Sequence, residues 1–306
     1  MDFRGNNYRI LGEKMYIEGD LEKSLALYKK ALEGSRTRDS KILILFNLGV
    51  ISTELNQISE AINYYKKITK LDKDHHHAYY QLGLIYEDLG ELNTAKDSYK
   101  RAIEISKEDT LSLYNLANLL DKEGKIKEAI SLYYKILDIN PNHPFALNNL
   151  GAIYEEEGDL KLSLSFLKKS ILHKDDFYLS HFNIGVVYGR LGKIDKALEY
   201  YHKAKALKPT YEYIYLNLSA IYIDKKDYKE AIRILSEGIS HKKDAHDLYY
   251  NRACSYALIK KYDLALNDIE ISLKLHPGLI NWVLLDEDLN ILREKKRYLE
   301  IIKNYI

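Results

Sequence analysis

The sequence has little of what staples, interrupts or anchors a chain. Its 306 residues include one cysteine, Cys254, and four prolines, which excludes an intrachain disulfide framework and argues against a proline-rich linker. The segment from Met1 to Leu11 lacks the apolar core of a signal peptide. No apolar run approaches the roughly 18 residues of a membrane-spanning helix. We therefore expect a cytoplasmic protein with no membrane partner.

A surplus of one charge is also absent. The chain has 46 Lys and Arg residues and 45 Asp and Glu residues, which leaves a net charge of +1. Nucleic-acid binding driven by bulk charge requires a clear excess of positive residues, so no nucleic-acid partner is predicted. Lysine pairs such as Lys29-Lys30 and Lys66-Lys67 recur in the chain, and we interpret them as a solvated outer face.

What the sequence does contain is repetition. A carboxamide, an apolar residue and a very small residue stand together in Asn47-Leu48-Gly49 and again, 34 residues later, in Gln81-Leu82-Gly83. With the carboxamide at position 6, repeats begin at residues 42, 76, 110, 144, 178, 212 and 246. A first repeat, starting near residue 5, has Gly12 at the small position but no carboxamide. Because a repeat array needs no single large core, the chain length does not imply two globular domains.

Each repeat predicts two helices, A and then B, of about a dozen residues each. Positions 4, 7, 8 and 11 form one apolar stripe, and positions 20, 24 and 27 form a second. The turn between them often holds a glycine, such as Gly90 or Gly124. Glycine at position 8 predicts close approach of helix B, through the alanine at position 20. Three extra residues within 34–40 predict a longer turn after the first repeat.

The end of the chain departs from this pattern. Residues 279–306 predict one helix, a short bend and a final helix. Their apolar side chains should cover the exposed end of the last repeat; these are Trp282, Leu285, Leu289, Leu292, Tyr298, Ile301 and Ile302.

The repeat resembles the tetratricopeptide repeat. The resemblance rests on an aromatic or apolar residue at position 4, Leu at 7, Gly or Ala at 8, Tyr at 11, Ala at 20, Tyr at 24 and Pro at 32, as at Pro141, Pro209 and Pro277. It implies an all-α fold: a right-handed superhelix of about eight repeats over residues 1–277, with a helical cap at 278–306. It also implies that A helices line a concave groove that docks peptides or partner proteins, and it implies no catalysis.

The carboxamides at position 6 are the first candidate site. A carboxamide offers two donors and an acceptor, so it can pair with the backbone of an extended ligand. The arrangement is similar to the asparagine ladder of O-linked N-acetylglucosamine transferases. The alternative is that these residues serve contacts between neighbouring A helices. The ladder consists of Asn47, Gln81, Asn115, Asn149, Asn183, Asn217 and Asn251.

Aromatic residues at position 5 are the second candidate. They would form pockets for apolar side chains of a ligand, unless they serve packing between helices; they are Phe46, Tyr80, Tyr114, Phe182 and Tyr250. Acidic residues at positions 12 and 13 predict an acidic edge and hence a neutral to basic ligand, or simply a solvated face; they are Glu54, Glu87, Asp88, Asp121, Glu155, Glu156 and Asp224.

Other candidates carry less weight. The clamp for heat-shock protein C-termini needs Lys or Arg where this chain has His77 and Gln81, so that variant is rejected. The triplet His75-His76-His77 lacks ligand spacing for a metal and is interpreted as a polar junction between repeats. Cys254 is expected to be a packing residue. We predict neither a cofactor nor a metal.

The predicted function is a non-catalytic protein-interaction scaffold that binds an extended peptide or a partner protein in the groove. Three alternatives stay open. The chain could recruit substrates for an enzyme supplied in trans, or it could be a peptide-sensing regulator. It could also associate with itself through the terminal repeats.

Overall fold

The computed structural model describes residues 3–306, and every regular element in this range is a helix. The chain is an α-solenoid of eight helix pairs followed by short closing helices. None of the described helices has the length and apolar composition to span a bilayer. The A helices are α1 (Phe3–Ile17), α3 (Arg38–Glu54), α5 (His76–Asp88), α7 (Thr110–Lys122), α9 (Pro144–Glu156), α11 (Tyr178–Arg190), α13 (Glu212–Asp224) and α15 (His246–Leu258). The B helices are α2 (Leu21–Gly34), α4 (Ile58–Leu71), α6 (Leu92–Ile105), α8 (Ile126–Ile139), α10 (Leu160–His173), α12 (Ile194–Leu207), α14 (Tyr228–His241) and α16 (Tyr262–Leu275).

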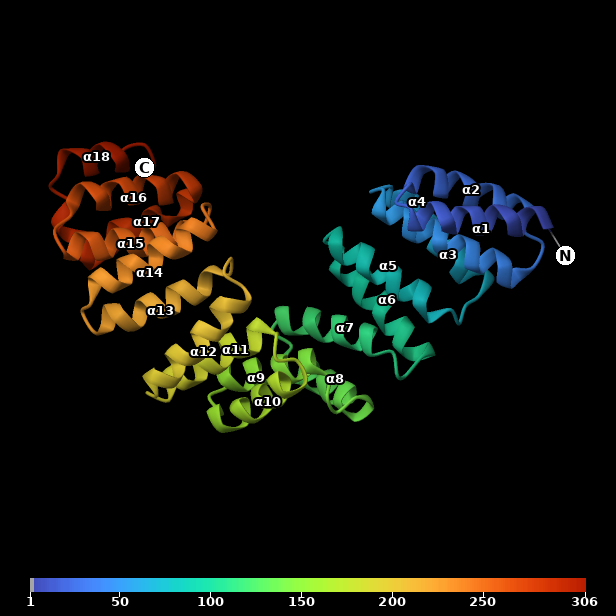
Figure 1. Ribbon diagram of the computed structural model, residues 1–306, viewed down its shortest axis with the longest axis horizontal. Helices are drawn as coiled ribbons and strands as arrows, with labels where there is room; N and C mark the ends of the chain where they lie inside the picture. Colours follow the sequence, from blue (N-terminus) through green and yellow to red (C-terminus); the bar gives the residue numbers. More distant parts are fainter. Residues whose placement is uncertain (1–2) are drawn as a thin grey trace. The chain divides into compact units, whose positions relative to one another are not determined.

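The helices pack into two compact units, one ending at Pro141 and the other beginning at Asn142. Within each unit, every A helix packs against the B helix that follows it, and that B helix packs against the next A helix. Figure 1 shows these pairs as neighbouring coils, α1 to α8 in the N-terminal unit and α9 to α16 in the C-terminal unit. Helices of 13 or 14 residues are marginal alone, so contacts between neighbours must stabilise them.

The turn inside each repeat has one conformation in all eight pairs. Position 15 lies in the left-handed region each time, with φ of +76° at Gly90 and +75° at Gly124. Glycine adopts this conformation at little cost. Asn56, Lys226 and Lys260 adopt it as well, with φ of +57°, +58° and +61°. The turn is therefore a property of the repeat, and glycine is its least strained occupant.

Close packing of helices A and B explains the small residue at position 8. A Cβ atom built on Gly83 would lie 2.4 Å from a ring carbon of Tyr99. The predicted close approach is present, but the nearest atoms belong to position 24 rather than to the alanine at position 20. Position 20 instead contacts the backbone: where serine replaces alanine, as at Ser163, its hydroxyl donates to the carbonyl of Gly151 at 2.6 Å.

The prediction of a longer turn after the first repeat is wrong. α2 ends at Gly34 and α3 begins at Arg38, so the extra residues lengthen α3 to 17 residues. The Thr37 hydroxyl caps this helix by accepting a hydrogen bond from the Ser40 amide at 3.3 Å, and Asp39 places a negative charge in the first turn. This polar segment can begin a helix, so no longer loop forms.

Short helices close the C-terminal end, namely η1 (Pro277–Leu279), α17 (Ile280–Leu285), η2 (Glu287–Leu292) and α18 (Lys296–Ile302). Their buried side chains form a common core with Ala253, Leu266 and Ile269 of the last repeat; they are Leu279, Val283, Leu289, Leu292, Tyr298, Ile301 and Ile302. Trp282 and Leu285, which were predicted to take part in this cover, do not: they are 68% and 78% exposed.

Candidate functional site

The seven carboxamides at position 6 lie at equivalent places on seven A helices, α3 to α15. Each is half-buried, because the neighbour at position 7, apolar in six of the seven repeats, faces the core while position 6 lies at its edge. In each compact unit they mark one face of the A helices. This regularity follows from the 34-residue period, since every repeat presents the same position to the same side.

Three members of the ladder donate to their own helix. The side-chain amide of Asn47 bonds to the carbonyl of Leu43 at 2.9 Å, that of Asn217 to Tyr213 at 2.8 Å, and that of Asn251 to Asp247 at 2.8 Å. Such bonds to the preceding turn fix the orientation of the side chain. They use one of the two amide hydrogens, and the carbonyl oxygen of Asn217 also accepts from the Tyr201 hydroxyl at 3.2 Å. Each residue thus keeps its second amide hydrogen for a ligand.

Two other members contact the preceding A helix. The amide of Asn115 lies 3.5 Å from the hydroxyl of Tyr80, and the amide of Asn183 donates to the Asn148 side chain at 3.1 Å. Asn149 accepts from the same Asn148 at 3.1 Å. These bonds match the alternative that the ladder serves contacts between A helices. Asn148 stands at position 5, where sequence reasoning looked only for aromatic residues.

Four of the five aromatic residues at position 5 pack on the tyrosine at position 24 of their own repeat; the fifth, Tyr250, has Ile269 at that position. Ring centroids are 5.6 Å apart for Phe46 and Tyr65, and 5.7 Å apart for Phe182 and Tyr201. The pairs Tyr80 with Tyr99 and Tyr114 with Tyr133 follow the same pattern at 6.1 and 6.2 Å. The rings are half-buried, so each combines a packing role with an accessible edge.

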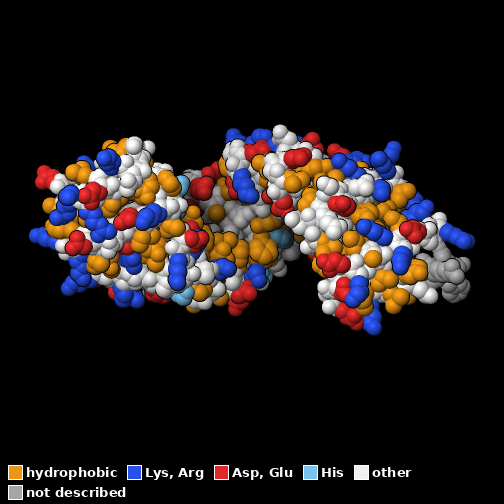
Figure 2. Space-filling view, turned by 90° about the horizontal axis from the view of Figure 1, so that it is seen from above, with side chains coloured by type: hydrophobic (Ala, Val, Ile, Leu, Met, Phe, Trp, Pro, Cys, Tyr) orange, Lys and Arg blue, Asp and Glu red, His pale blue; other side chains and the backbone are white. Residues whose placement is uncertain are grey.

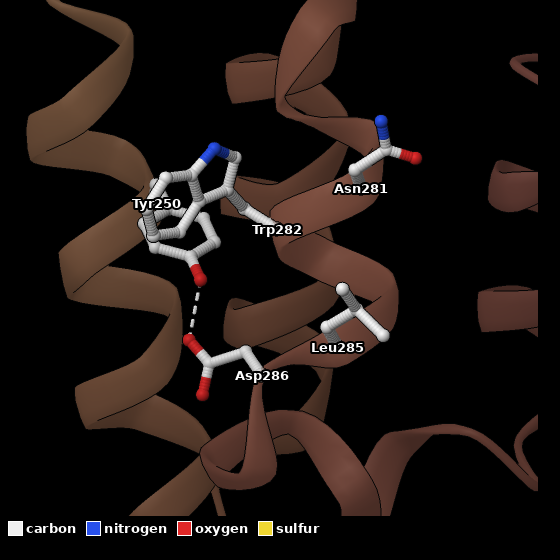
Figure 3. A pocket seen from close by; sticks show the side chains of 5 residues that line it. All are labelled: Tyr250, Asn281, Trp282, Leu285 and Asp286. Atoms are coloured by element: carbon white, nitrogen blue, oxygen red, sulfur yellow. Dashed lines mark hydrogen bonds between the residues drawn. The ribbon is translucent and has the colours of Figure 1, made fainter.

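Two open pockets contain a position 5 aromatic. One, of about 370 Å³, is lined by Asp39, Ile42, Leu43, Phe46, Asp72, His75 and His77. The other, of about 440 Å³, is lined by Tyr250, Asn281, Trp282, Leu285 and Asp286 (Figure 3). Phe46 and Tyr250 were predicted to be pocket residues, whereas the partners that later repeats or the closing helices contribute were not predicted.

The predicted acidic edge is partly neutralised. Glu155 pairs with Arg190 of the next A helix at 2.7 Å, and Glu87 lies 3.8 Å from Lys122 while accepting a hydrogen bond from the Tyr99 hydroxyl at 2.9 Å. Burial raises the pKa of Asp121. On the face shown in Figure 2, acidic, basic and hydrophobic side chains are interspersed. The edge therefore carries less uncompensated negative charge than its number of Asp and Glu residues suggests.

The histidine triplet is part of the junction between repeats. Nδ1 of His75 accepts a hydrogen bond from the Ala78 amide at 3.2 Å and so caps α5, and His76 lies 3.3 Å from Asp109. Burial lowers the pKa of His75 and His77, which favours neutral imidazoles. In the described part of the chain, no three His, Cys, Asp or Glu side chains converge in a metal-binding arrangement.

Sequence comparison assigns this architecture to a family. Models described as tetratricopeptide repeat match residues 43–75, 76–109, 111–143, 132–164, 178–211 and 213–243. The chain therefore belongs to the tetratricopeptide repeat family, whose arrays are protein-interaction scaffolds. No curated protein shows significant similarity to it.

Solved structures share the fold. A tetratricopeptide repeat protein from Parabacteroides merdae is 16% identical with a TM-score of 0.64, over 86% of this chain and 97% of that one. A chain of the APC/C hetero-tetramer Cut9-Hcn1 is 19% identical with a TM-score of 0.61, over 94% of this chain and 52% of that one. YrrB, described as a TPR protein with an unusual peptide-binding site, is 25% identical with a TM-score of 0.50, over 63% and 96%.

Proposed function

We propose that this protein is a non-catalytic scaffold that binds an extended peptide, or an extended segment of a partner protein, along the face of its A helices. The recurrence of a half-buried carboxamide at the same place on successive A helices carries the proposal. The ladder residues would contact the backbone of the ligand. The aromatic residues at position 5 would form pockets for its side chains.

The hydrogen bonds of the ladder are compatible with this role. Asn217 and Asn251 use one amide hydrogen in their own helix, which orients the rest of the carboxamide before a ligand arrives. Each bond to a peptide unit would contribute about 0.5–1.5 kcal/mol net. Several together would offset the cost of ordering a flexible ligand. The peptide-binding site named for YrrB supports the same kind of ligand.

The pockets support side-chain recognition at fixed intervals. Phe46 and Tyr250 stand at the same position of their repeats, and each borders an open pocket that the following segment of the chain helps to line. An extended ligand places alternate side chains on one side, so some of its side chains could enter such pockets while its backbone meets the carboxamides. If the captured partner is an enzyme, the scaffold would act as its recruiting subunit.

The test replaces Asn149, Asn183 and Asn217 together by Ala. Partners are first captured from native lysate on the wild-type protein and identified by mass spectrometry, and the affinity of each is then measured for both proteins. We expect the triple variant to lose about tenfold or more in affinity, since three peptide contacts are removed.

Helical content and melting temperature are measured alongside. A matched variant carries Asn63→Ala and Asn93→Ala, which removes exposed carboxamides from α4 and α6, both B helices; it should bind like wild type. Unchanged affinity in the triple variant overturns the ladder as a binding site. Unfolding of the triple variant would assign the ladder to structure instead.

A further inference from the structure

The pocket at the C-terminal end continues the face of the A helices. α17 begins at Ile280, 34 residues after α15 begins at His246, so α17 stands where the A helix of a ninth repeat would start. Leu285 then occupies position 6, the ladder position, and Tyr250 of α15 occupies position 5. In Figure 3, Trp282 and Leu285 extend from α17 beside Tyr250, and Asp286 follows the end of that helix.

Two apolar side chains that line this pocket are largely exposed. Trp282, the only tryptophan of the chain, is 68% exposed, and Leu285 is 78% exposed. The neighbouring Val283, by contrast, is fully buried in the core of the last repeat. Large apolar side chains gathered around an open pocket are typical of a binding surface.

Asp286 lines the same pocket, and two further carboxylates directly follow it in the chain. Asp286, Glu287 and Asp288 follow one another, and none of them forms an ion pair with a cationic side chain within residues 3–306. Arg293, which lies nearby, donates to the backbone carbonyl of Asp286 at 3.2 Å and not to its carboxylate. Burial, together with the charges of Asp286 and Glu287, raises the pKa of Asp288. The cluster thus carries uncompensated negative charge.

The structure also fixes the carboxylate of Asp286. It accepts hydrogen bonds from the Tyr250 hydroxyl and from the backbone amide of Asp288, the latter at 2.9 Å, and the thiol of Cys254 lies 3.4 Å away. The Asp286 carboxylate is therefore held in place beside the ring of Tyr250. Aromatic faces next to a carboxylate attract a cation whose aliphatic stem packs on the rings.

We propose that this pocket binds a peptide segment in which a large apolar side chain adjoins an arginine or a lysine. The apolar side chain packs against Trp282, Leu285 and Tyr250. The cationic head lies beside the acidic border formed by residues 286–288. This inference rests on the proposed function, because the pocket belongs to the same face, and it names the ligand chemistry at one end of that face.

Trp282 supplies a specific probe, because all tryptophan fluorescence of the chain comes from this residue. The wild-type protein is titrated with the peptide acetyl-Gly-Ser-Leu-Arg-Leu-Ser-Gly-amide. Two counterparts replace the arginine by glutamate or both leucines by serine. We expect saturable changes in emission with the arginine peptide, about tenfold weaker binding of each counterpart, and weaker binding of the arginine peptide as salt rises.

The variant Glu287→Gln with Asp288→Asn should bind the arginine peptide about fivefold or more weakly, because it loses two attractive charges. The matched variant Glu294→Gln with Glu300→Gln changes the net charge equally at exposed carboxylates of the same segment and should bind like wild type. Equal losses of affinity in both variants would mean that only the net charge of the segment matters, which would overturn the proposal. Equal affinity for the arginine and glutamate peptides, or unchanged Trp282 emission, would overturn it as well.

The outcome is separable from that of the ladder. The Asn149, Asn183 and Asn217 triple variant leaves every residue lining this pocket in place, so it should keep the fluorescence response. Failure of the peptide titration together with ladder-dependent capture would overturn this inference alone. If the triple variant keeps its affinity for captured partners while the arginine peptide still binds, only the role of the carboxamides would be overturned.

Discussion

The repeat formed by α5 and α6 and the repeat formed by α15 and α16 share one backbone pattern but build it from different residues. At position 7 the first has Leu82 and the second Arg252; at position 15, Gly90 and Lys260. Both repeats have the left-handed turn and both bury position 20 completely. The comparison shows which features of the repeat are geometric requirements and which can be met by more than one chemistry.

Position 7 shows the larger difference. Leu82 is buried among apolar neighbours. Arg252 instead makes two hydrogen bonds to the carboxylate of Asp268, at 2.7 and 2.8 Å, and a third to the Ser236 hydroxyl at 2.9 Å. The side chains of Arg252 and Asp268 are only 16% and 5% exposed. At this position the side chain must fill the space, and any polar group it brings must be hydrogen-bonded. An apolar side chain meets this requirement without a partner.

The largest effect should come from breaking that ion pair. Arg252→Leu alone leaves the Asp268 carboxylate buried without its partner, so we expect a loss of about 3–5 kcal/mol in the free energy of unfolding. Arg252→Leu combined with Asp268→Leu should recover most of it, because no buried charge is then left without a partner. Urea unfolding, monitored by circular dichroism, measures the free energy of unfolding of the single and the double variant. A single variant that loses less than about 1 kcal/mol would mean that the pair is screened by solvent.

A smaller effect is expected at the turn. Lys260 holds φ at +61° and Gly90 at +76°, and a side chain is disfavoured in this region. Lys260→Gly should therefore raise the free energy of unfolding by about 0.5–1 kcal/mol, after allowance for the greater freedom of glycine in the unfolded chain. Gly90→Lys should lower it by a similar amount. Thermal melts of the two variants check the signs, and a destabilising Lys260→Gly would contradict the reasoning.

The smallest effect is expected in the stability of the first turn of α5 as the pH falls. His75 caps α5 through a neutral imidazole, whereas Ala245, at the same place before α15, provides no side-chain cap. Burial lowers the pKa of His75 from its usual 6.5, so below that value the unfolded chain binds more protons than the folded one. The stabilising contribution is complete above about pH 6.5 and is lost as the pH falls through the folded pKa.

Amide exchange in the first turn of α5 should accordingly accelerate between about pH 7 and pH 5, relative to the first turn of α15 and after correction for intrinsic exchange, by an amount corresponding to about 1 kcal/mol or less. His75→Asn keeps a capping side chain that does not titrate, so it should reduce the difference to the part contributed by His77, whose pKa burial also lowers. An equal response in both helices would exclude the cap as its origin.

Much of the architecture could be predicted from the sequence because each repeat must meet the same neighbours. The A helices begin at His76, Thr110 and Pro144, the first positions of their repeats. Prediction was wrong where two local structures suit one segment: residues 35–40 contain polar residues typical of a turn, but Thr37 and Asp39 also start a helix well. Position 24, and not position 20, fills the space beside Gly83. This depends on the length of the side chain at position 24 and not on the spacing of residues in the sequence.

The candidate site was predictable in position but not in detail. The period places Asn183 and Asn217 on equivalent helix faces, yet Asn183 donates to Asn148 of the preceding A helix. Asn217 instead donates to its own helix and accepts from Tyr201, on the preceding B helix. The difference arises because position 5 of the preceding repeat offers a carboxamide to Asn183. Such choices depend on which side chain happens to stand opposite, and a one-dimensional pattern does not contain that information.

By itself, the sequence determined the repeat frame, the helix pairs and the face that carries the carboxamides, because a 34-residue period forces equivalent residues into equivalent places. Only the tertiary structure decided that Arg252 and Asp268 meet inside the last repeat, and that Trp282 and Leu285 stay exposed. The reason is physical: α17 ends at Leu285 because Asp286 bonds to the amide of Asp288 and starts η2. The chain turns away there and leaves an open pocket beside Tyr250.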